Sequence, residues 1–319
     1  MLLAELIQER LCFFHIGSVE AFGEAATCRS HGDGGHDVRL HAMFARQGGH
    51  MVFRVRDLGA KLLNASIPKS GYRVTRDIAY GSLPHQRLDL YVPKAVNNAP
   101  LVLYFYGGGW THGDRRTYPF VAEALTSAGI AFAVADYGLY PEARYPSFLD
   151  DGAAAFHYVR EHATDLGIDG TRLFLAGHSA GAYNAVMLAV NPHYLSDADR
   201  TSLKGAVGVA GLYDFLPLKS PTMIEIFGGA NCKETQPIEY VDGKAAPILL
   251  AHGGKDDVVH PGNSRRMARK LAAFGSDVEL KEYPNAGHVD IIVSLARGFR
   301  RRTTLRDDIV SFVHRHGSS

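Results

Sequence analysis

The sequence predicts an α/β fold in which helices cover both faces of a mostly parallel central sheet. Residues 101–106 and 130–135 form continuous apolar runs, as expected of strands that are covered on both faces. Helical patterns separate such runs, and strands that alternate with helices become parallel neighbours through right-handed crossovers. No internal repeat or linker divides residues 72–316. These observations indicate one large α/β domain.

The first part of the chain differs from the rest. Residues 30–37 are rich in glycine and polar groups and show no periodicity, which is typical of a loop or connector. We therefore expect residues 1–50 to form a poorly ordered extension and residues 51–319 to form the folded domain. Within that domain, residues 52–67 show a helical pattern that Pro68 ends.

From residue 72 onward the predicted elements follow in regular order. Residues 72–80 and 87–92 alternate like the two strands of an antiparallel ribbon, with a turn at residues 81–84. Short apolar runs predict further strands, and apolar residues that recur every three or four positions predict helices. The strands are expected at 101–106, 130–136, 172–176, 205–209, 247–252 and 278–283, and the helices at 118–128, 148–163, 180–190, 264–274 and 304–315.

Composition and charge exclude several other classes of protein. Hydrophobic residues make up 46% of the 319 residues and charged residues 21%, which indicates a folded globular chain. The formal net charge of +1 predicts no general attraction to nucleic acid. The apolar runs are far shorter than the roughly 18 residues of a membrane-spanning helix. We expect neither a nucleic-acid partner nor a membrane span, and the sequence leaves the oligomeric state open.

Cysteines and histidines predict neither a disulfide framework nor a metal site. Cys12, Cys28 and Cys232 are too scattered for either. The sixteen histidines lack the paired spacing of zinc ligands. The N-terminus lacks the uninterrupted apolar centre of a secretory signal, because Glu5 and Glu9 fall within it. These features favour a cytoplasmic protein with free thiols.

Residues 172–182 carry the pattern of a nucleophile elbow. A predicted strand runs directly into Gly-His-Ser-Ala-Gly, and a predicted helix follows. In a Gly-x-Ser-x-Gly elbow the chain reverses sharply, and flanking glycines such as Gly177 and Gly181 avoid collisions at the bend. Ser179 would then stand above the carboxyl edge of the sheet. The alternative is a plain glycine-serine turn, but the strand and helix on either side favour a nucleophile.

A serine nucleophile needs a base and an acid, expected later in the chain in the order acid, then histidine. Asp256 and Asp257 both follow the strand at 247–252, and we favour Asp256 because Asp257 is equally typical of a cap or a solvated loop. His288 lies on a short glycine-bearing loop after the next strand. The competing histidines are expected elsewhere: His178 with its side chain leaving the nucleophile on the other side, His252 satisfying a loop, and His260 on the surface.

A third motif predicts donors for a developing oxyanion. The strand at 101–106 ends in three consecutive glycines followed by Trp110, and glycines let the backbone approach a substrate oxygen closely. The N–H groups of Gly107 and Gly108, with that of Ala180 after the nucleophile, would form the oxyanion hole. A phosphate-binding loop is the alternative, but neither of its glycine signatures is present.

With these motifs in one order, the chain resembles the α/β-hydrolase superfamily. It is similar in particular to carboxylesterases of the hormone-sensitive-lipase and feruloyl-esterase-like branches, whose neighbours include kynurenine formamidases. The resemblance covers residues 72–315 and includes Asp-Tyr-Gly-Leu-Tyr-Pro-Glu at 136–142. It implies an α/β-hydrolase fold, a nucleophile at Ser179, a base at His288, an orienting acid at Asp256 and an oxyanion hole at Gly107, Gly108 and Ala180.

Two positions depart from the pattern of that family. Tyr106 stands where the family commonly has a histidine before the three glycines, which leaves the donors in place but removes the usual brace of the loop. Gly138 stands where the family tends to have an arginine, so an ion pair is missing there. We expect Asp136 and Glu142 to be structural.

The expected activity is hydrolysis of small to medium carboxylic esters through an acyl-enzyme, with no metal or other cofactor. An arylformamidase is the nearest alternative, since it needs the same three residues, and a non-catalytic binding module is the alternative of a different class. Residues in the expected pocket region are aromatic, although such side chains are also typical of a core. The candidate pocket residues are Trp110, Tyr213, Phe215 and Phe227.

Overall fold

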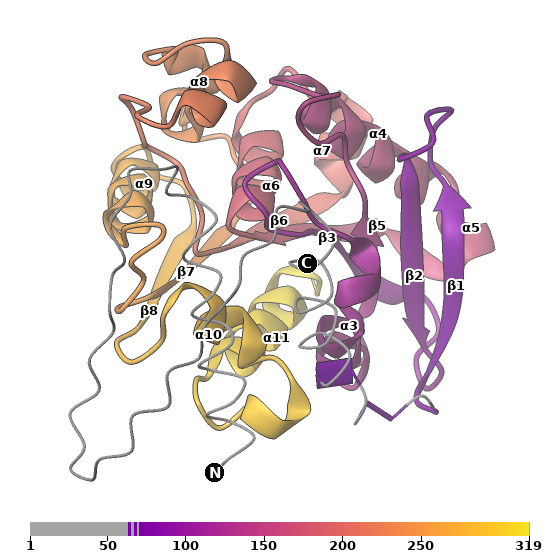
Figure 1. The fold of residues 1–319 in the computed structure, drawn as a ribbon. Coiled ribbons are helices and arrows are strands. Elements are labelled where there is room, and N and C mark those ends of the chain that lie inside the picture. The colour runs from indigo at the N-terminus through magenta and orange to yellow at the C-terminus, as the bar shows by residue number, and fades with distance from the viewer. Residues whose placement is uncertain (1–62, 65–66, 69, 319) are drawn as a thin grey trace, which may run out of the picture. The chain divides into compact units, whose positions relative to one another are not determined.

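The computed structural model describes residues 63–64, 67–68 and 70–318. The predicted extension at residues 1–50 and most of the predicted helix at 52–67 lie outside the described residues. The described chain folds around one eight-stranded sheet with the strand order β1-β2-β4-β3-β5-β6-β7-β8 (Figure 1).

The sheet is antiparallel at one edge and parallel elsewhere. β1 (Tyr72–Ala79) and β2 (Arg87–Pro93) form the predicted antiparallel ribbon, and β2 pairs antiparallel with β4 (Ala131–Ala135). The remaining pairs are all parallel. Their strands are β3 (Ala99–Phe105), β5 (Ile168–His178), β6 (Leu203–Val209), β7 (Ile248–Gly253) and β8 (Val278–Tyr283).

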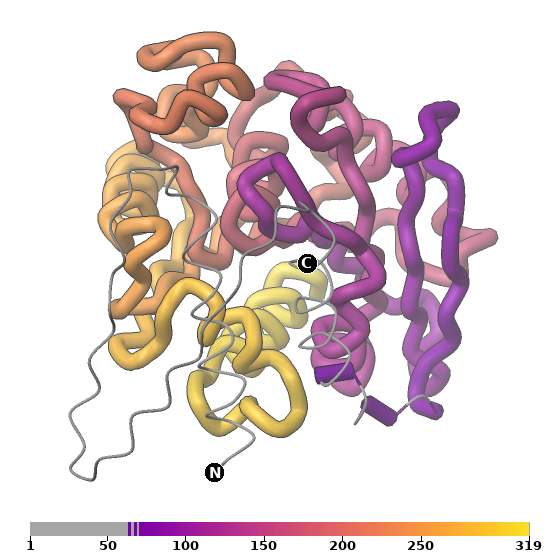
Figure 2. Tube along the Cα trace, viewed as in Figure 1, coloured from indigo at the N-terminus to yellow at the C-terminus, as the bar shows by residue number. Residues whose placement is uncertain are grey.

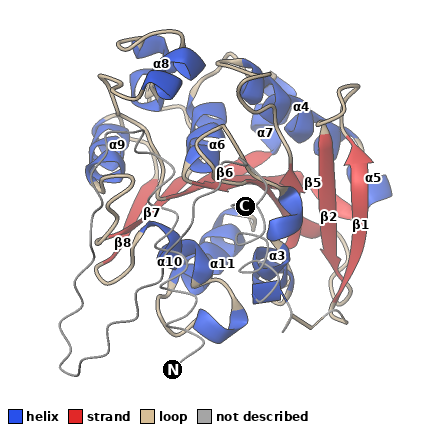
Figure 3. Ribbon diagram, viewed as in Figure 1, coloured by secondary structure: helices blue, strands red, loops and turns tan. Residues whose placement is uncertain are grey.

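Helices cover both faces of this sheet, as predicted (Figure 3). One side carries α4 (Ser147–Glu161), α6 (Ala180–Val190), α7 (Asp197–Ser202) and α9 (Gly262–Ala273). The other side carries α3 (Pro119–Thr126), α10 (His288–Val293) and α11 (Leu305–His316). The short helices α5 (Ala163–Leu166) and α8 (Pro221–Phe227) complete the set, with 3-10 turns at Arg115–Thr117, Lys233–Thr235, Pro237–Tyr240 and Arg297–Phe299.

β3, β4 and α6 lack polar faces because they lie at the centre of the core. Every residue of β3 and β4 is buried, since helices cover the sheet on both sides there. All of α6 is buried as well, because this helix packs against β3, β5 and β6 on one side and against α4 on the other. A helix that is apolar all round is stable only in such a position.

The last helix closes the fold against an early one. In Figure 2 the yellow C-terminal segment runs beside the purple segment that contains α3. Arg306 Nε donates to the Ala124 carbonyl at 3.0 Å, the His314 ring bonds to the Ala128 carbonyl at 3.1 Å, and Arg300 pairs with Glu123. The arginines at 300–302 therefore lie partly in structural contacts of this face.

No helix among the described residues is both long and apolar enough to cross a membrane. In the same part of the chain, no three histidine, cysteine, aspartate or glutamate side chains are grouped so that they could hold a metal ion.

Candidate active site

The predicted elbow at Ser179 has the strained backbone that its motif requires. Ser179 joins β5 to α6 with φ 56° and ψ −120°, a conformation that non-glycine residues seldom adopt. A Cβ atom on Gly177 would lie 2.1 Å from the Gly181 carbonyl oxygen, and one on Gly181 would lie 2.0 Å from the Phe105 carbonyl oxygen. Only glycine fits at either position, so the two glycines permit the bend that presents Ser179.

His288 lies between Ser179 and Asp256 and contacts both. His288 Nε2 is 3.0 Å from Ser179 Oγ, and His288 Nδ1 is 2.8 Å from Asp256 Oδ2. His288 begins α10 just after β8, and Asp256 follows β7, so the two loops leave neighbouring parallel strands at the same edge of the sheet. The structure thus brings together three side chains that the sequence separates by up to 109 positions.

The carboxylate of Asp256 is buried and is surrounded by donors. Its Oδ1 accepts the backbone N–H groups of Val258 at 3.0 Å and Val259 at 2.8 Å. Burial alone would raise the pKa of Asp256, but hydrogen bonds from His252, His288 and Val259 outweigh burial and hold this pKa well below its ordinary value. Asp256 is therefore a fixed anion beside His288. Asp257, by contrast, is exposed.

Two of the three competing histidines lie against these residues. His178 is buried, its ring centroid is 4.7 Å from that of His288, and its Nε2 donates to the His288 carbonyl at 2.9 Å. The expectation that His178 leaves the site was wrong, because the loop that carries His288 passes on the side to which His178 points. Burial and the neighbouring His288 lower the pKa of His178 to about 3, so its ring is neutral.

His252 is buried as well, and it does hold a loop, as expected. Its Nε2 is 2.8 Å from the Val259 carbonyl oxygen and 3.2 Å from Asp256 Oδ2. The contact with Asp256 was not predicted, although the spacing of four residues from His252 to Asp256 could have signalled it. His260 is exposed, as expected.

The glycine loop after β3 lies directly beside the elbow. A Cβ atom on Gly107 would be 3.1 Å from the Ser179 Cβ, which shows how closely this backbone approaches the serine. Gly108 has φ 140°, and a Cβ there would lie 1.9 Å from the His112 carbonyl oxygen. Among the described residues, the N–H groups of Gly107, Gly108 and Ala180 donate to no protein acceptor. Ala180 also begins α6, where the helix dipole favours negative charge.

Aromatic stacking braces the start of this loop in place of the usual histidine. Tyr106 is buried, and its ring stacks on Tyr137 with centroids 4.8 Å apart. The Tyr137 hydroxyl donates to the Tyr106 carbonyl at 2.7 Å. In place of that histidine, Tyr137 holds both the side chain and the backbone of Tyr106.

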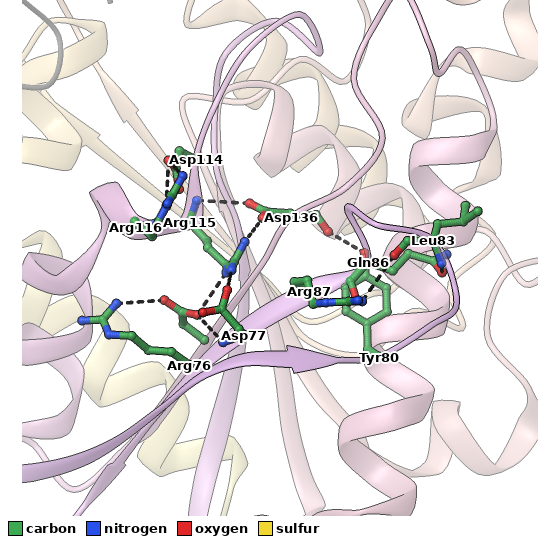
Figure 4. A network of polar contacts seen from close by, with 11 residues as sticks. Arg76, Asp77, Tyr80, Leu83, Gln86, Arg87, Asp114, Arg115, Arg116 and Asp136 are labelled. Atoms are coloured by element: carbon green, nitrogen blue, oxygen red, sulfur yellow. Dashed lines mark hydrogen bonds and ion pairs between the residues drawn. The ribbon is translucent and has the colours of Figure 1, made fainter. Parts of the chain in front are cut away.

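An ion-pair network around Arg115 anchors the other end of the loop (Figure 4). Arg115 Nε donates to Asp89 Oδ1 at 3.0 Å, and its backbone N–H donates to Asp136 Oδ1 at 3.1 Å. The guanidinium also pairs with Asp136 and with Asp77. Asp89 is 1% exposed and takes a further contact from Arg76 at 3.0 Å. Asp136, for which the sequence offered no partner at position 138, is paired with Arg115 instead.

Three of the four candidate pocket residues, Trp110, Phe215 and Phe227, form an aromatic cluster with Tyr183 of α6. Trp110 and Phe227 lie 4.9 Å apart between ring centroids, and Phe215 and Phe227 lie 5.5 Å apart. Trp110, Tyr213 and Phe227 are at most 2% exposed, which favours a place in the core. Phe215 is half-buried, and it alone of the four has an appreciable exposed surface. Their role as pocket residues stays a prediction.

Comparison with known proteins supports the predicted fold. A truncated carbohydrate esterase from gut microbiota superposes with a TM-score of 0.69 over 79% of this chain and 99% of its own, at 20% identity. A thermostable esterase from Pseudomonas putida ECU1011 superposes with a TM-score of 0.63 over 85% of this chain and 92% of its own, at 22% identity. These structures share the α/β-hydrolase fold, which confirms the predicted fold class.

Curated relatives match over most of the described chain. Esterase LipC of Mycobacterium tuberculosis is 28% identical over 242 residues, which cover 67% of this chain and 59% of that protein. Isoprenylcysteine alpha-carbonyl methylesterase ICME of Arabidopsis thaliana is 29% identical over 269 residues, which cover 76% of this chain and 62% of that protein. The chain thus spans about three fifths of the length of these two relatives.

A family model named BD-FAE matches residues 88–271, more than half of the chain. The matched segment contains the elbow with Ser179, the glycine loop and Asp256, and it ends before His288. Together with the fold, this match confirms the resemblance that the motifs indicated: the chain belongs to the BD-FAE family of α/β hydrolases.

Proposed function

We propose that this protein is a carboxylesterase-type serine hydrolase that cleaves esters of small to medium acyl chains through an acyl-enzyme. One observation carries the proposal: Ser179, His288 and Asp256 are in direct contact in that order. Ser179 Oγ lies 3.0 Å from His288 Nε2, and His288 Nδ1 lies 2.8 Å from Asp256 Oδ2. This arrangement is the one by which a weakly nucleophilic hydroxyl is activated.

In the first half of the reaction, Ser179 Oγ attacks the ester carbonyl while His288 Nε2 takes the serine proton. The imidazolium that forms is stabilised by the Asp256 anion, whose lowered pKa keeps the proton on His288. His288 then gives its proton to the oxygen of the departing alcohol. The acyl group remains on Ser179 as an ester.

The N–H groups of Gly107, Gly108 and Ala180 stabilise the oxyanion of each tetrahedral intermediate in this proposal. Fixed donors that need no reorganisation are the largest single contribution in many acyl-transfer enzymes. In the second half of the reaction, His288 takes a proton from water, and the resulting hydroxide attacks the acyl-enzyme. Ser179 leaves with the proton from His288, which restores the starting state.

Several findings favour an ester as the substrate. LipC is named an esterase, ICME a methylesterase, and the two structural relatives are titled esterases. No finding favours the arylformamidase alternative.

The direct test is Ser179→Ala assayed with p-nitrophenyl acetate and butyrate. Because the variant lacks the nucleophile, kcat/KM should fall on the order of a thousandfold or more while the thermal transition stays intact. Ser82→Ala, on the exposed turn between β1 and β2, is the matched control and should retain full activity. A serine-directed organophosphate should add its mass to the peptide that contains Ser179.

The same assay extended to longer acyl chains, with N-formylkynurenine beside them, defines the substrate class. We expect turnover of short and medium esters and little turnover of the formamide. Esterase activity that survives Ser179→Ala would reject the nucleophile, and faster turnover of the formamide would reassign the protein to the alternative class.

A further inference from the structure

The proposed catalytic acid contacts a second histidine besides His288. His252, at the end of β7, lies with Nε2 at 3.2 Å from Asp256 Oδ2, the same oxygen that His288 contacts at 2.8 Å. The side chains of His252 and Asp256 are both 0% exposed. Water is therefore excluded from this contact, and the mechanism described above does not use it.

The neighbours of His252 define which ring nitrogen carries a proton. Nε2 is 2.8 Å from the Val259 carbonyl oxygen, which can only accept, so Nε2 must donate. The same nitrogen lies 3.2 Å from Asp256 Oδ2, so the N–H dipole also acts on the carboxylate while its hydrogen bond goes to Val259. On the other side of the ring, Nδ1 lies 2.7 Å from Ser264 Oγ, so Ser264 can donate to it in the neutral ring. The Val259 carbonyl thus defines the tautomer with the proton on Nε2, and Ser264 on α9 satisfies Nδ1 of that tautomer.

We propose that His252 is a positioning residue for the catalytic acid. It fixes the direction of Asp256 Oδ2 and withdraws part of the carboxylate charge from His288. With the backbone donors of Val258 and Val259 on Oδ1, Asp256 is held by donors on both oxygens. The inference rests on the function proposed above and adds a specific residue to it.

The backbone of the acid loop is held by further contacts besides the one between His252 and the Val259 carbonyl. Gly254 N donates to the Tyr283 carbonyl at 2.8 Å, and Lys255 N donates to the Ala286 carbonyl at 3.0 Å. A buried polar ring is costly unless its hydrogen bonds are used. An apolar side chain of similar size would fill the same space, so the donor itself is what distinguishes histidine at position 252.

Removal of this donor has a defined effect on the base. The titratable groups that interact with one another here are Asp256, His252, His288 and His178. Without the His252 N–H, more of the Asp256 charge acts on His288 and stabilises the protonated imidazole. Protonated His288 cannot accept the Ser179 proton, so the acid limb of the kcat/KM profile should move to higher pH.

The test compares His252→Leu, which removes the donor, with His252→Gln, whose amide N–H₂ can still donate. The control is His260→Gln, a surface histidine on the same loop. Each variant is assayed with p-nitrophenyl butyrate from pH 5 to 9. For His252→Leu we expect kcat to fall roughly tenfold with KM little changed, and the acid limb to rise by on the order of half a pH unit. His252→Gln should recover most of kcat, and His260→Gln should match the wild type.

Ser264→Ala serves as a second variant where His252→Leu does not fold. It leaves His252 in place but removes the hydrogen-bond partner of Nδ1 that holds the ring in position. It should lower kcat by a smaller factor, with the same direction of pH shift. The inference is overturned if the acid limb of the kcat/KM profile stays in place in both His252→Leu and Ser264→Ala. Where His252→Leu does not fold, an unmoved acid limb in Ser264→Ala alone overturns it. The two proposals can fail separately. If the acid limb does not move but the wild-type enzyme is active and is labelled at Ser179, the proposed function stands. If the wild-type enzyme has no esterase activity, the proposed function itself is rejected.

Discussion

The two sides of Ser179 are held in place by different kinds of interaction. On the acid–base side, buried side chains contact one another directly: His288 lies on Asp256, and His252 and His178 lie beside them. On the side of the proposed oxyanion hole, the candidate donors are backbone N–H groups, those of Gly107, Gly108 and Ala180. Glycines offer no side chain to hold, so the contacts that brace the loop lie at its two ends, at Tyr106 and Arg115.

The two sides therefore differ in how easily they can be predicted from a sequence motif. A site made of side chains carries its chemistry in its residue types, so aspartate and histidine after successive strands are informative. A site made of backbone amides depends on residues that share no motif with it. The supports of the oxyanion loop come from β2, from the end of β4 and from the turn at Arg115–Thr117.

The largest expected effect separates the two adjacent aspartates on the acid–base side. Asp256→Asn should lower kcat by on the order of a thousandfold or more, because the amide cannot stabilise protonated His288. Asp257→Asn, at an exposed position, should change kcat by less than about threefold. Steady-state kinetics with p-nitrophenyl butyrate measures both. The reverse order of the two losses would assign the acid to Asp257.

A smaller loss is expected from a change in the oxyanion loop. Gly108→Ala forces a Cβ to within 1.9 Å of the His112 carbonyl oxygen at φ 140°, so the loop must shift away from Ser179. We expect kcat to fall by about a hundredfold, as when one oxyanion donor is lost. Gly109→Ala is the control: its φ of 58° also strains an added Cβ, but no atom lies within 4 Å of that Cβ. Equal losses in the two variants would contradict a specific role for Gly108.

Arg115, which holds the far end of the glycine loop, is expected to affect activity least and stability most. Arg115→Gln leaves the buried Asp89 without its main partner and should lower the free energy of unfolding by about 3 kcal/mol. Because the loop is displaced only at its far end, kcat should fall about tenfold or less. Arg116→Gln removes an exposed pair with Asp114 and should cost less than about 1 kcal/mol. Urea unfolding and kinetics on both variants give the comparison, and equal stabilities would show that Arg115 is no anchor.

Local patterns predicted most of the fold because they depend on neighbours in the chain. The apolar runs at 101–106 and 130–135 correspond to β3 and β4, and the elbow residues lie at the predicted junction of β5 and α6. The helices α7, α8 and α10 were not predicted. They have six or seven residues each, too few for apolar periodicity to be recognised, and tertiary contacts stabilise them instead.

In the candidate site, too, the residues recognised in advance were those marked by neighbours in the chain. Ser179, Asp256 and His288 were predicted from their positions after strands, and the structure brings them together. His178 and His252 could not be assigned, because whether a histidine contacts the site or a loop depends on which strand lies next to which. Arg115 was missed for the same reason, since its partners Asp77, Asp89 and Asp136 are 21 to 38 positions away in sequence.

The sequence by itself determined the strand-turn-helix at Ser179, since steric limits on a few adjacent residues dictate such a bend. It also determined the α/β class, because the periodicity of apolar residues defines which faces must be buried. Only the tertiary structure decided that two further histidines flank the base and the acid, and that Arg115 joins three carboxylates beside the oxyanion loop. Those contacts depend on the order of strands in the sheet, which no short segment of the chain encodes.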